Sequence, residues 1–465
     1  MNIAIGKISK SVRFDKEYRK AGKGDLAPMA CFISLAKKYP QHKFYVIGSS
    51  DLRETAKDAE TRKLNEIPDN IIDLGTIAHN RFAVSKKEKK SIGGFGSFMK
   101  KNDSETFDYM CEYTVDEIKK QGLVFDFGIF FLGPDCTTAT PFCYNVGVYE
   151  KTGKKQFLQN LEMTANYSAP IIHSINTFKF PYIFVNEDPR YAPMVIKDIL
   201  NDEQCFLSHL NKDCTVKRVL GYYDESLKTR REHVEHFIYS GIERTSLMFL
   251  KKYDFRNKED FVVEGKHYKK DGFIFVACNE SPSRFNNIKN WILDMYPNVP
   301  IYGRWTDETI KGYEDRFINK PMAYLQDEMW RAKYTYIPGF FDKMTNFVTI
   351  KIWEMCIYGI LPLFDKTKYD TDHCVPVPEF LRCSSPAEMK EKIETLEADP
   401  VLYQKYLNDI YQLINDDYFN GEFNCKVFAP IFEKDPKTLT TEDWKENAAK
   451  LLDEYKLKPA RQIVS

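Results

Sequence analysis

The chain lacks several patterns that would assign it to common protein classes. No apolar run approaches the roughly 18 residues that a membrane-spanning helix requires. The start MNIAIG has no charged region followed by a long apolar core, as a secretion signal would. The eleven Cys include no CxxC pair and no Cys/His cluster, which argues against structural zinc and favours reduced thiols. We therefore expect a soluble cytoplasmic protein that is not exported.

Net charge is also absent, because 67 Lys and Arg balance 67 Asp and Glu. A nucleic-acid partner must then be bound by local basic patches and not by a global field. The loop after the first predicted strand has no GxGxxG, so a dinucleotide fingerprint is missing. Aromatic residues are abundant, with 34 Phe and 28 Tyr. Such residues stack on bases or sugars in some proteins, although packing is their commoner use.

Apolar strands alternating with helices predict an α/β protein. The helical stretch Leu26–Lys38 lies between the strand-like Asn2–Gly6 and Lys43–Ser49, which is a βαβ pattern. Asp126–Gly133 and Phe180–Val185 are continuous apolar runs, typical of central parallel strands whose carboxyl ends face a ligand site. At 465 residues, the chain is long enough for two such domains.

A second set of elements begins at Gly272–Cys278, after the charged stretch Lys251–Asp271, which we expect to be an interdomain linker. The further elements that we expect are a helix at Ile288–Asp294, a strand at Val299–Tyr302, and helices at Glu388–Leu396, Pro400–Asp416, Lys426–Phe432 and Trp444–Tyr455. This order repeats the pattern of a doubly wound domain.

The segment Thr345–Phe364 organises the second half of the chain. It predicts a helix over 347–358, with Asn346 as the N-cap and Gly359 as a left-handed C-cap, followed at once by the buried strand Ile360–Phe364.

Two charged residues, Lys351 and Glu354, stand three apart on this otherwise apolar helix and so share one face. This arrangement suits a nucleotide-sugar, since the carboxylate can accept ribose hydroxyls while the cation and the helix N-terminus face the diphosphate. The alternative is an ordinary i,i+3 ion pair at the rim of a core helix, which on the helix alone is the commoner case.

Carboxylates follow the strand Phe180–Val185, where catalytic groups of open α/β sheets gather. Glu187 and Asp188 are both candidates for a general base, and Arg190 lies two residues further on. The alternative is an Asp-Pro turn with a surface ion pair. Asp25 precedes the helix Leu26–Lys38. It is a third candidate for a site residue, and an N-cap of this helix is an equally good explanation.

The segment Ser85–Lys101 combines Lys, Gly and Phe residues and predicts a basic loop suited to phosphates. Its candidate nucleic-acid contacts are Lys86, Lys87, Lys89, Lys90, Lys100 and Lys101. A solvated surface loop is the alternative.

The sequence NFVTIKIWE, followed by an apolar strand and FDKTKYDTDH, resembles the donor-binding segment of the DNA β-glucosyltransferases of T-even bacteriophages. The resemblance is densest over Asn346–Ile414. It implies that Lys351, in place of an Arg, holds a phosphate of UDP and that Glu354 holds the ribose. Lys keeps the charge of Arg but loses its bidentate fork.

The same resemblance assigns further roles. It implies Asp188 as the base, Arg190 as a nucleic-acid contact and Asp25 as a residue near the sugar and acceptor. Two Arg four apart grip the diphosphate in that family; here Arg284 matches the second, whereas Glu280 replaces the first. The candidates for the missing cation are Lys289 and Arg304.

These inferences predict a GT-B fold with two Rossmann-like domains facing a cleft, at 1–255 and 256–430, and helices of 431–465 returning to the first domain. The implied activity is inverting transfer from a UDP-sugar, of the UDP-glucose or UDP-arabinose type, to the hydroxymethyl group of a flipped pyrimidine such as 5-hydroxymethylcytosine in double-stranded phage DNA. No membrane partner is expected, and the protein is expected to be a monomer; Mg²⁺ or Mn²⁺ is compatible with the sequence but not required. The alternatives are a protein, glycan or small-molecule acceptor, or a catalytically silent binder of nucleotide-sugars or DNA.

Overall fold

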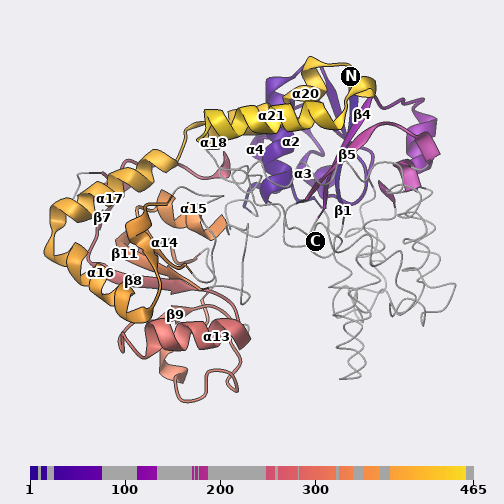
Figure 1. The fold of residues 1–465 in the computed structure, drawn as a ribbon. Coiled ribbons are helices and arrows are strands. Elements are labelled where there is room, and N and C mark those ends of the chain that lie inside the picture. Colours follow the sequence, from indigo (N-terminus) through magenta and orange to yellow (C-terminus); the bar gives the residue numbers. More distant parts are fainter. Residues whose placement is uncertain are drawn as a thin grey trace, which may run out of the picture. The chain divides into compact units, whose positions relative to one another are not determined.

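The computed structural model describes residues 1–8, 12–17, 26–75, 113–132, 170–171, 173–175, 177–186, 248–256, 260–280, 282–320, 324–338, 350–366 and 377–456. These residues form two compact units (Figure 1). The first holds those up to residue 246 together with 424–449, and the second holds those of 247–423 and those from 450 onward.

A parallel sheet of five strands, in the order β3-β2-β1-β4-β5, forms the centre of the first unit. Its strands are β1 (Asn2–Ile8), β2 (Lys43–Val46), β3 (Ile71–Asp73), β4 (Phe127–Leu132) and β5 (Tyr182–Asn186). The strand order reverses between β1 and β4, which are paired from Ile3 opposite Phe127 to Ile8 opposite Leu132. Ligands of open α/β sheets bind beyond the carboxyl ends of the strands at such a reversal.

The helices α2 (Leu26–Lys38), α3 (Leu52–Thr55) and α4 (Ala59–Leu64) belong to this unit. α2 lies beside β1 and β2, and the ring of its buried Phe32 meets Phe131 of β4 edge to face, with centroids 5.5 Å apart. The helix predicted at Leu26–Lys38 is confirmed over the described residues and ends at Lys38 as expected.

C-terminal residues complete the first unit, as the predicted fold class requires. They belong to α19 (Glu422–Val427), α20 (Ala429–Glu433), the short 3₁₀ helix Pro436–Thr438 and α21 (Thr441–Glu454). The buried Asn424 donates from Nδ2 to Ser34 Oγ of α2 at 2.9 Å, and the ring of Phe432 stacks on Tyr39 with centroids 3.8 Å apart. These contacts attach the end of the chain to its beginning.

The second unit contains a sheet of six strands in the order β10-β9-β8-β11-β12-β13, with all neighbours parallel. Its strands are β8 (Gly272–Ala277), β9 (Ile301–Tyr302), β10 (Phe317–Ile318), β11 (Ala332–Ile337), β12 (Leu361–Asp365) and β13 (Arg382–Cys383). The order reverses between β8 and β11. Two parallel α/β sheets in one chain confirm the predicted fold class.

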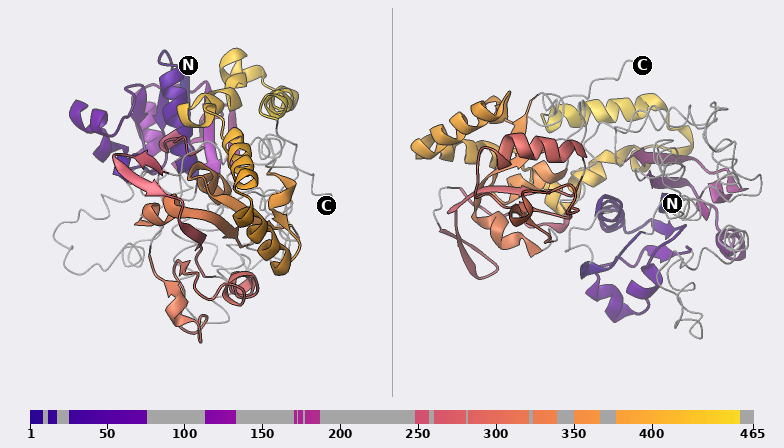
Figure 2. Two further views of the ribbon diagram at one scale, coloured as in Figure 1. Left: turned by 90° about the vertical axis from the view of Figure 1, so that its left-hand side faces the viewer. Right: turned by 90° about the horizontal axis from the view of Figure 1, so that it is seen from below.

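The helices of this unit are α13 (Pro282–Ile288), which continues as a π-helix over Lys289–Leu293, α14 (Gln326–Arg331), α15 (Ile350–Ile357), α16 (Pro386–Ala398), α17 (Pro400–Leu413) and α18 (Asp417–Asn420), with 3₁₀ turns at Glu314–Arg316 and Glu379–Leu381. α16 and α17 pack beside β12 and β13 (Figure 2). Ser385 is the N-cap of α16, since its Oγ accepts from Glu388 N at 3.2 Å.

The expected linker Lys251–Asp271 is corrected by the structure. It contains an antiparallel hairpin of β6 (Asp260–Val263) and β7 (Lys266–Lys269). The alternation of charged and apolar residues buries Phe261 and Tyr268 against Trp330 of α14. A period of two marks a strand with one buried face, even where several of its residues are charged.

Two further elements differ from the expectation. The helix expected at Ile288–Asp294 begins at Pro282, in keeping with the preference of Pro for the first turn of a helix. The central strand β11 was missed, although AKYTYI is rich in residues that favour strands.

Candidate functional site

The candidate site lies at the carboxyl end of the second sheet, where β8 and β11 lie side by side. α13 follows β8 along the chain, and α15 follows β11. Since the strand order reverses between these two strands, this is the position at which an open α/β sheet binds its ligand.

The helix α15 brings two charged residues to this edge. Its core face is fully buried through Ile352, Trp353 and Met355. Its end is fixed by Gly359, whose φ of 64° and close approach to the ring of Phe255 leave no room for a Cβ atom. The C-cap predicted at Gly359 is thus confirmed.

Lys351 reaches across to the neighbouring strand. Its ammonium donates to the carbonyl oxygen of Ala277, the last residue of β8. Burial lowers the pKa of Lys351, and nearby Arg284 lowers it further, whereas Cys278 and Glu354 raise it. The ammonium is therefore held at the end of β8 with less hydration than a surface lysine has.

Glu354 lies half-buried beside Lys351, but within the described part of the chain no ion pair joins the two side chains. Its carboxylate likewise has no hydrogen bond there. Burial raises the pKa of Glu354, and Lys351 lowers it. The simple i,i+3 ion pair is therefore not what forms, and the carboxylate oxygens of Glu354 keep their capacity to accept hydrogen bonds.

Arg284, on α13, joins this cluster from the other side. Its Nη1 donates to the carbonyl oxygen of Asn279 at 3.0 Å. Both Arg284 and Lys351 lie close enough to the buried thiol of Cys278 to oppose the rise that burial causes in its pKa. Of the six residues proposed to bind the donor, the structure thus brings Arg284, Lys351 and Glu354 together.

Arg304 is attached to the same edge through the loop after β9. Its backbone N–H donates to Asn279 Oδ1 at 3.2 Å, and its side chain is exposed. Lys289 differs, because its ammonium binds Asp294 at 2.8 Å within its own helical segment. The structure does not bring Lys289 to the cluster.

The remaining predicted residues lie outside the described residues. They are Asp25, Glu187, Asp188, Arg190, Asn346, Lys86, Lys87, Lys89, Lys90, Lys100 and Lys101.

Several polar residues of interest were missed from the sequence. Asn279, Thr306 and Thr309 line the loops after β8 and β9, and polar side chains directly after short strands are the signal that could have found them. Lys7 is only 1% exposed near the carboxyl end of β1, opposite Phe131 of β4. A lone Lys in the apolar run NIAIGKI marks it.

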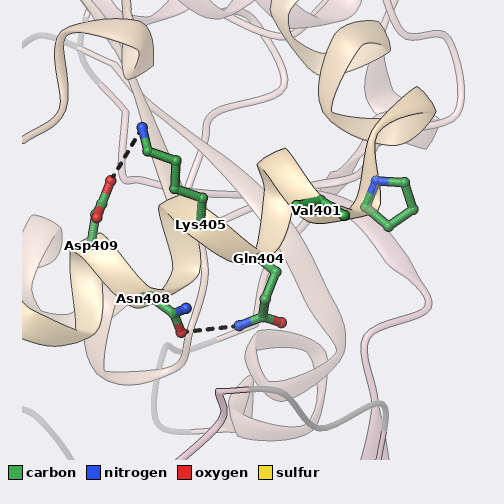
Figure 3. A pocket seen from close by; sticks show the side chains of 6 residues that line it. Val401, Gln404, Lys405, Asn408 and Asp409 are labelled. Atoms are coloured by element: carbon green, nitrogen blue, oxygen red, sulfur yellow. Dashed lines mark hydrogen bonds and ion pairs between the residues drawn. The ribbon is translucent and has the colours of Figure 1, made fainter.

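Other features of the described residues do not form a competing site. An open hollow of about 510 Å³ on α17 is lined by Pro400, Val401, Gln404, Lys405, Asn408 and Asp409. Figure 3 shows that its polar side chains pair with one another: Gln404 with Asn408 at 3.1 Å, and Lys405 with Asp409 at 3.9 Å. Among described residues, no three His, Cys, Asp or Glu side chains gather as a metal site needs, and no helix there has the length and apolar character to cross a membrane.

No known family and no curated protein matches the chain in sequence. Among solved structures, it is similar to T4 phage β-glucosyltransferase, with 14% identity over 97% of this chain and 100% of that one and a TM-score of 0.43. It is also similar to Anabaena HepE in complex with UDP, with 9% identity over 93% and 100% of the two chains and a TM-score of 0.36. UDP-GlcNAc 2-epimerase from Methanocaldococcus jannaschii gives 12% identity over 85% and 92%, with a TM-score of 0.34. At these values none of the three bears on what this chain binds.

Proposed function

We propose that the chain is a glycosyltransferase that takes its sugar from a UDP-sugar. The observation that carries the proposal is the pair Lys351 and Glu354 at the reversal point of the second sheet. The ammonium binds the end of β8, and the carboxylate beside it has no hydrogen-bond partner in the described residues. A half-buried carboxylate that no described donor satisfies is free to accept hydrogen bonds, and this favours a ligand with hydroxyl groups.

The roles of the donor-binding residues follow from their chemistry. Glu354 accepts hydrogen bonds from the two ribose hydroxyls, since an ionised carboxylate is an acceptor only. Lys351, Arg284 and Arg304 face the diphosphate, and charge-assisted bonds to phosphate are about twice as strong as neutral ones. Asn346, as the expected cap of α15, places the positive end of that helix toward the same group.

The proposed reaction is a single displacement. The acceptor hydroxyl attacks the anomeric carbon and passes its proton to Asp188, while the bond from the anomeric carbon to the diphosphate oxygen breaks and UDP leaves with the electron pair. The configuration at the anomeric carbon inverts. Lys351 and Arg284 stabilise the charge that develops on the departing UDP. Glu187 and Asp25 are the alternative bases.

The proposed acceptor is the hydroxymethyl group of a pyrimidine in phage DNA, as the resemblance to phage DNA glucosyltransferases implies. The target base leaves the stack to reach the enzyme, because its reacting atom is inaccessible inside the duplex. Arg190 and the lysines of the segment Ser85–Lys101 bind the backbone phosphates. The reaction then takes place in the host cytoplasm.

Mass spectrometry of DNA tests this function directly. We expect that incubation with a mixed pool of UDP-sugars adds one sugar per hydroxymethylated pyrimidine, that the added mass identifies a hexose or a pentose, and that plain duplex stays unmodified. Hydrolysis of the UDP-sugar without any change in the DNA would contradict the DNA acceptor. Absence of both hydrolysis and transfer across the pool would contradict the enzyme.

Two alternatives rest on particular observations. The balanced charge of the chain favours a protein, glycan or small-molecule acceptor, and Glu280 in place of a cation favours a silent binder. Neutralising Lys86, Lys87, Lys89 and Lys90 distinguishes an enzyme with a protein, glycan or small-molecule acceptor from one that acts on DNA. If the segment binds DNA, duplex affinity falls and its salt dependence flattens, because fewer counterions are released. UDP affinity stays unchanged, and an unaltered salt slope would favour the other acceptors.

A further inference from the structure

Two loops at the carboxyl edge of the second sheet are joined to each other by hydrogen bonds. One loop (278–280) follows β8 and the other (303–309) follows β9. Glu280 N donates to Arg304 O at 2.9 Å, and Trp305 Nε1 donates to Cys278 O at 2.9 Å. Gly303 permits this contact, because its φ is 143° and a Cβ atom would lie 1.9 Å from Cys278 O.

The Glu280 carboxylate of the first loop accepts further hydrogen bonds from the second loop. Its Oε2 accepts from Thr306 N at 3.0 Å, and its Oε1 accepts from Thr306 Oγ1 at 2.9 Å and also from Thr309 Oγ1. These bonds, the one from Thr309 first, lower the pKa of Glu280, so the carboxylate is ionised at neutral pH. Glu280 therefore holds the 303–309 loop through three hydrogen bonds, and a cation at position 280 could not make them.

Arg304 lies in the loop that these hydrogen bonds hold, and its guanidinium makes none of them. Its side chain is exposed and, among the residues that the structure describes, has neither an ion pair with Glu280 nor another partner. Asn279 links the two arginines of this edge, since its carbonyl accepts from Arg284 Nη1 and its Oδ1 accepts from Arg304 N. The backbone of Arg304 is thus fixed beside the loop to which Arg284 is bound.

We propose that Glu280 is a positioning residue for phosphate recognition: it fixes the 303–309 loop so that Arg304 binds the same diphosphate as Arg284. This inference rests on the proposed function. Arg304 supplies the second cation, and Glu280 acts through Arg304 without touching the ligand.

Simple electrostatics predicts the opposite sign for the removal of Glu280. Its negative charge lies near the place of an anionic ligand, so without a positioning role its removal would strengthen UDP binding. If Glu280 positions Arg304, its removal weakens UDP binding. The sign of one measurement therefore decides between the two cases.

Calorimetric affinities for UDP and uridine, measured with the full chain, test the proposal. Arg304→Gln and Glu280→Ala should each weaken UDP binding by about tenfold, the loss expected for a charge-assisted bond. Uridine binding should not change, because uridine has no phosphate. In the Arg304→Gln background, Glu280→Ala should cause no further loss of UDP affinity. Lys269→Gln, which removes an exposed cation from β7, is the matched control and should leave the ratio of the two affinities unchanged.

The possible failures are distinguishable. A wild-type chain that does not bind UDP would overturn the proposed function and this inference with it. Normal UDP binding by wild type and by Arg304→Gln, or stronger binding by Glu280→Ala, would overturn the inference alone. If Glu280→Ala lowers UDP affinity equally in the wild-type and Arg304→Gln backgrounds, the inference is also overturned, because Glu280 then acts on the structure and not through Arg304. If Glu280→Ala does not fold, Thr309→Val removes one bond of the same carboxylate and should lower UDP affinity without changing uridine affinity.

Discussion

Two lysines contact opposite ends of the same sheet, and their surroundings differ. Lys270 precedes β8, and its ammonium donates to Ala332 O at 2.8 Å and to Tyr358 O at 2.6 Å. Lys351 lies at the other end, where it donates to Ala277 O beside the open carboxylate of Glu354. Burial lowers the pKa of both amines, that of Lys270 well below its usual value.

The two lysines also differ in their position relative to the dipole of helix α15. Lys270 binds a carbonyl at the C-terminal end of this helix, where the helix dipole favours a cation. Lys351 lies in its first described turn, toward the positive end, where the dipole disfavours one. Lys270 thus has two carbonyl partners, one of them at the negative end of the helix, whereas Lys351 lies toward the positive end, and burial opposes the charge of both amines.

The neighbouring charges follow the same division. At the amino ends of β8 and β11, Arg331 binds Asp271 at 2.8 Å, and Lys333 binds Glu397 at 2.9 Å. Beyond the carboxyl ends, Glu354 and Arg304 have no such partners within the described residues. Paired charges at one end and unpaired charges at the other indicate that the first set serves the fold and that the second serves a ligand.

The largest loss should follow from a change to Asp188, which comes two residues after β5 in the sequence. A general base contributes typically about 10² to 10⁴-fold to a rate, so Asp188→Asn should slow transfer by that factor. UDP affinity should change little, because the substitution keeps the shape of the side chain. Glu187→Gln should cost much less, since adjacent residues leaving a strand point in different directions.

Single-turnover transfer and calorimetry of UDP binding measure the two effects separately. A normal rate with Asp188→Asn and a collapse with Glu187→Gln would move the base by one residue. If neither variant is slow, Asp25 becomes the next base to test.

Local patterns in the sequence were enough to predict elements but not contacts. The helix Leu26–Lys38 and the cap at Gly359 were predictable because apolar periodicity and a left-handed glycine are properties of adjacent residues. The hairpin over 260–269 was missed because four of its ten residues are charged. The spacing of Lys351 and Glu354 put them on one face, but only the fold shows that the ammonium binds Ala277, 74 residues earlier in the chain.

The open carboxylate of Glu354 should produce the next largest effect. We expect Glu354→Gln to weaken UDP binding by about 1 to 3 kcal/mol, since it removes a charged acceptor for the ribose hydroxyls. Calorimetry with the folded variant measures this loss. The control is Glu397→Gln, which changes a carboxylate bound to Lys333 and Tyr334 and should leave UDP affinity intact. Equal UDP affinities for wild type and Glu354→Gln would assign Glu354 to the core and not to a ligand.

The two lysines themselves give a smaller but sharper contrast. Lys270→Met should destabilise the second unit by about 1 to 2 kcal/mol, because two carbonyl oxygens lose a charged donor. Its effect on UDP affinity should be negligible. Lys351→Met should reduce UDP affinity, whatever its effect on stability. Urea unfolding and calorimetry on both variants measure this, and a Lys270→Met protein that is stable but fails to bind UDP would reverse the assignment.

The smallest expected effect is the dependence of UDP binding on pH. Burial lowers the pKa of Lys351, so in the free protein part of this amine is neutral at alkaline pH below the usual lysine value of about 10.4. A bound diphosphate favours the charged form and raises that pKa again, so binding takes up a proton in this window.

UDP affinity should therefore fall as pH rises through the lowered pKa of Lys351, by at most about tenfold per pH unit for one proton. The groups around the amine are Cys278, Glu354 and Arg284, of which only Cys278, with a pKa raised by burial, can titrate nearby. Calorimetry in buffers of different ionisation enthalpy counts the protons taken up. Lys270→Met should keep the wild-type profile, and Cys278→Ser should keep the proton uptake, whereas Lys351→Met should lose it. An alkaline fall in affinity that survives in Lys351→Met would show that another group binds the proton, and the contrast between the two lysines would then not extend to the ligand.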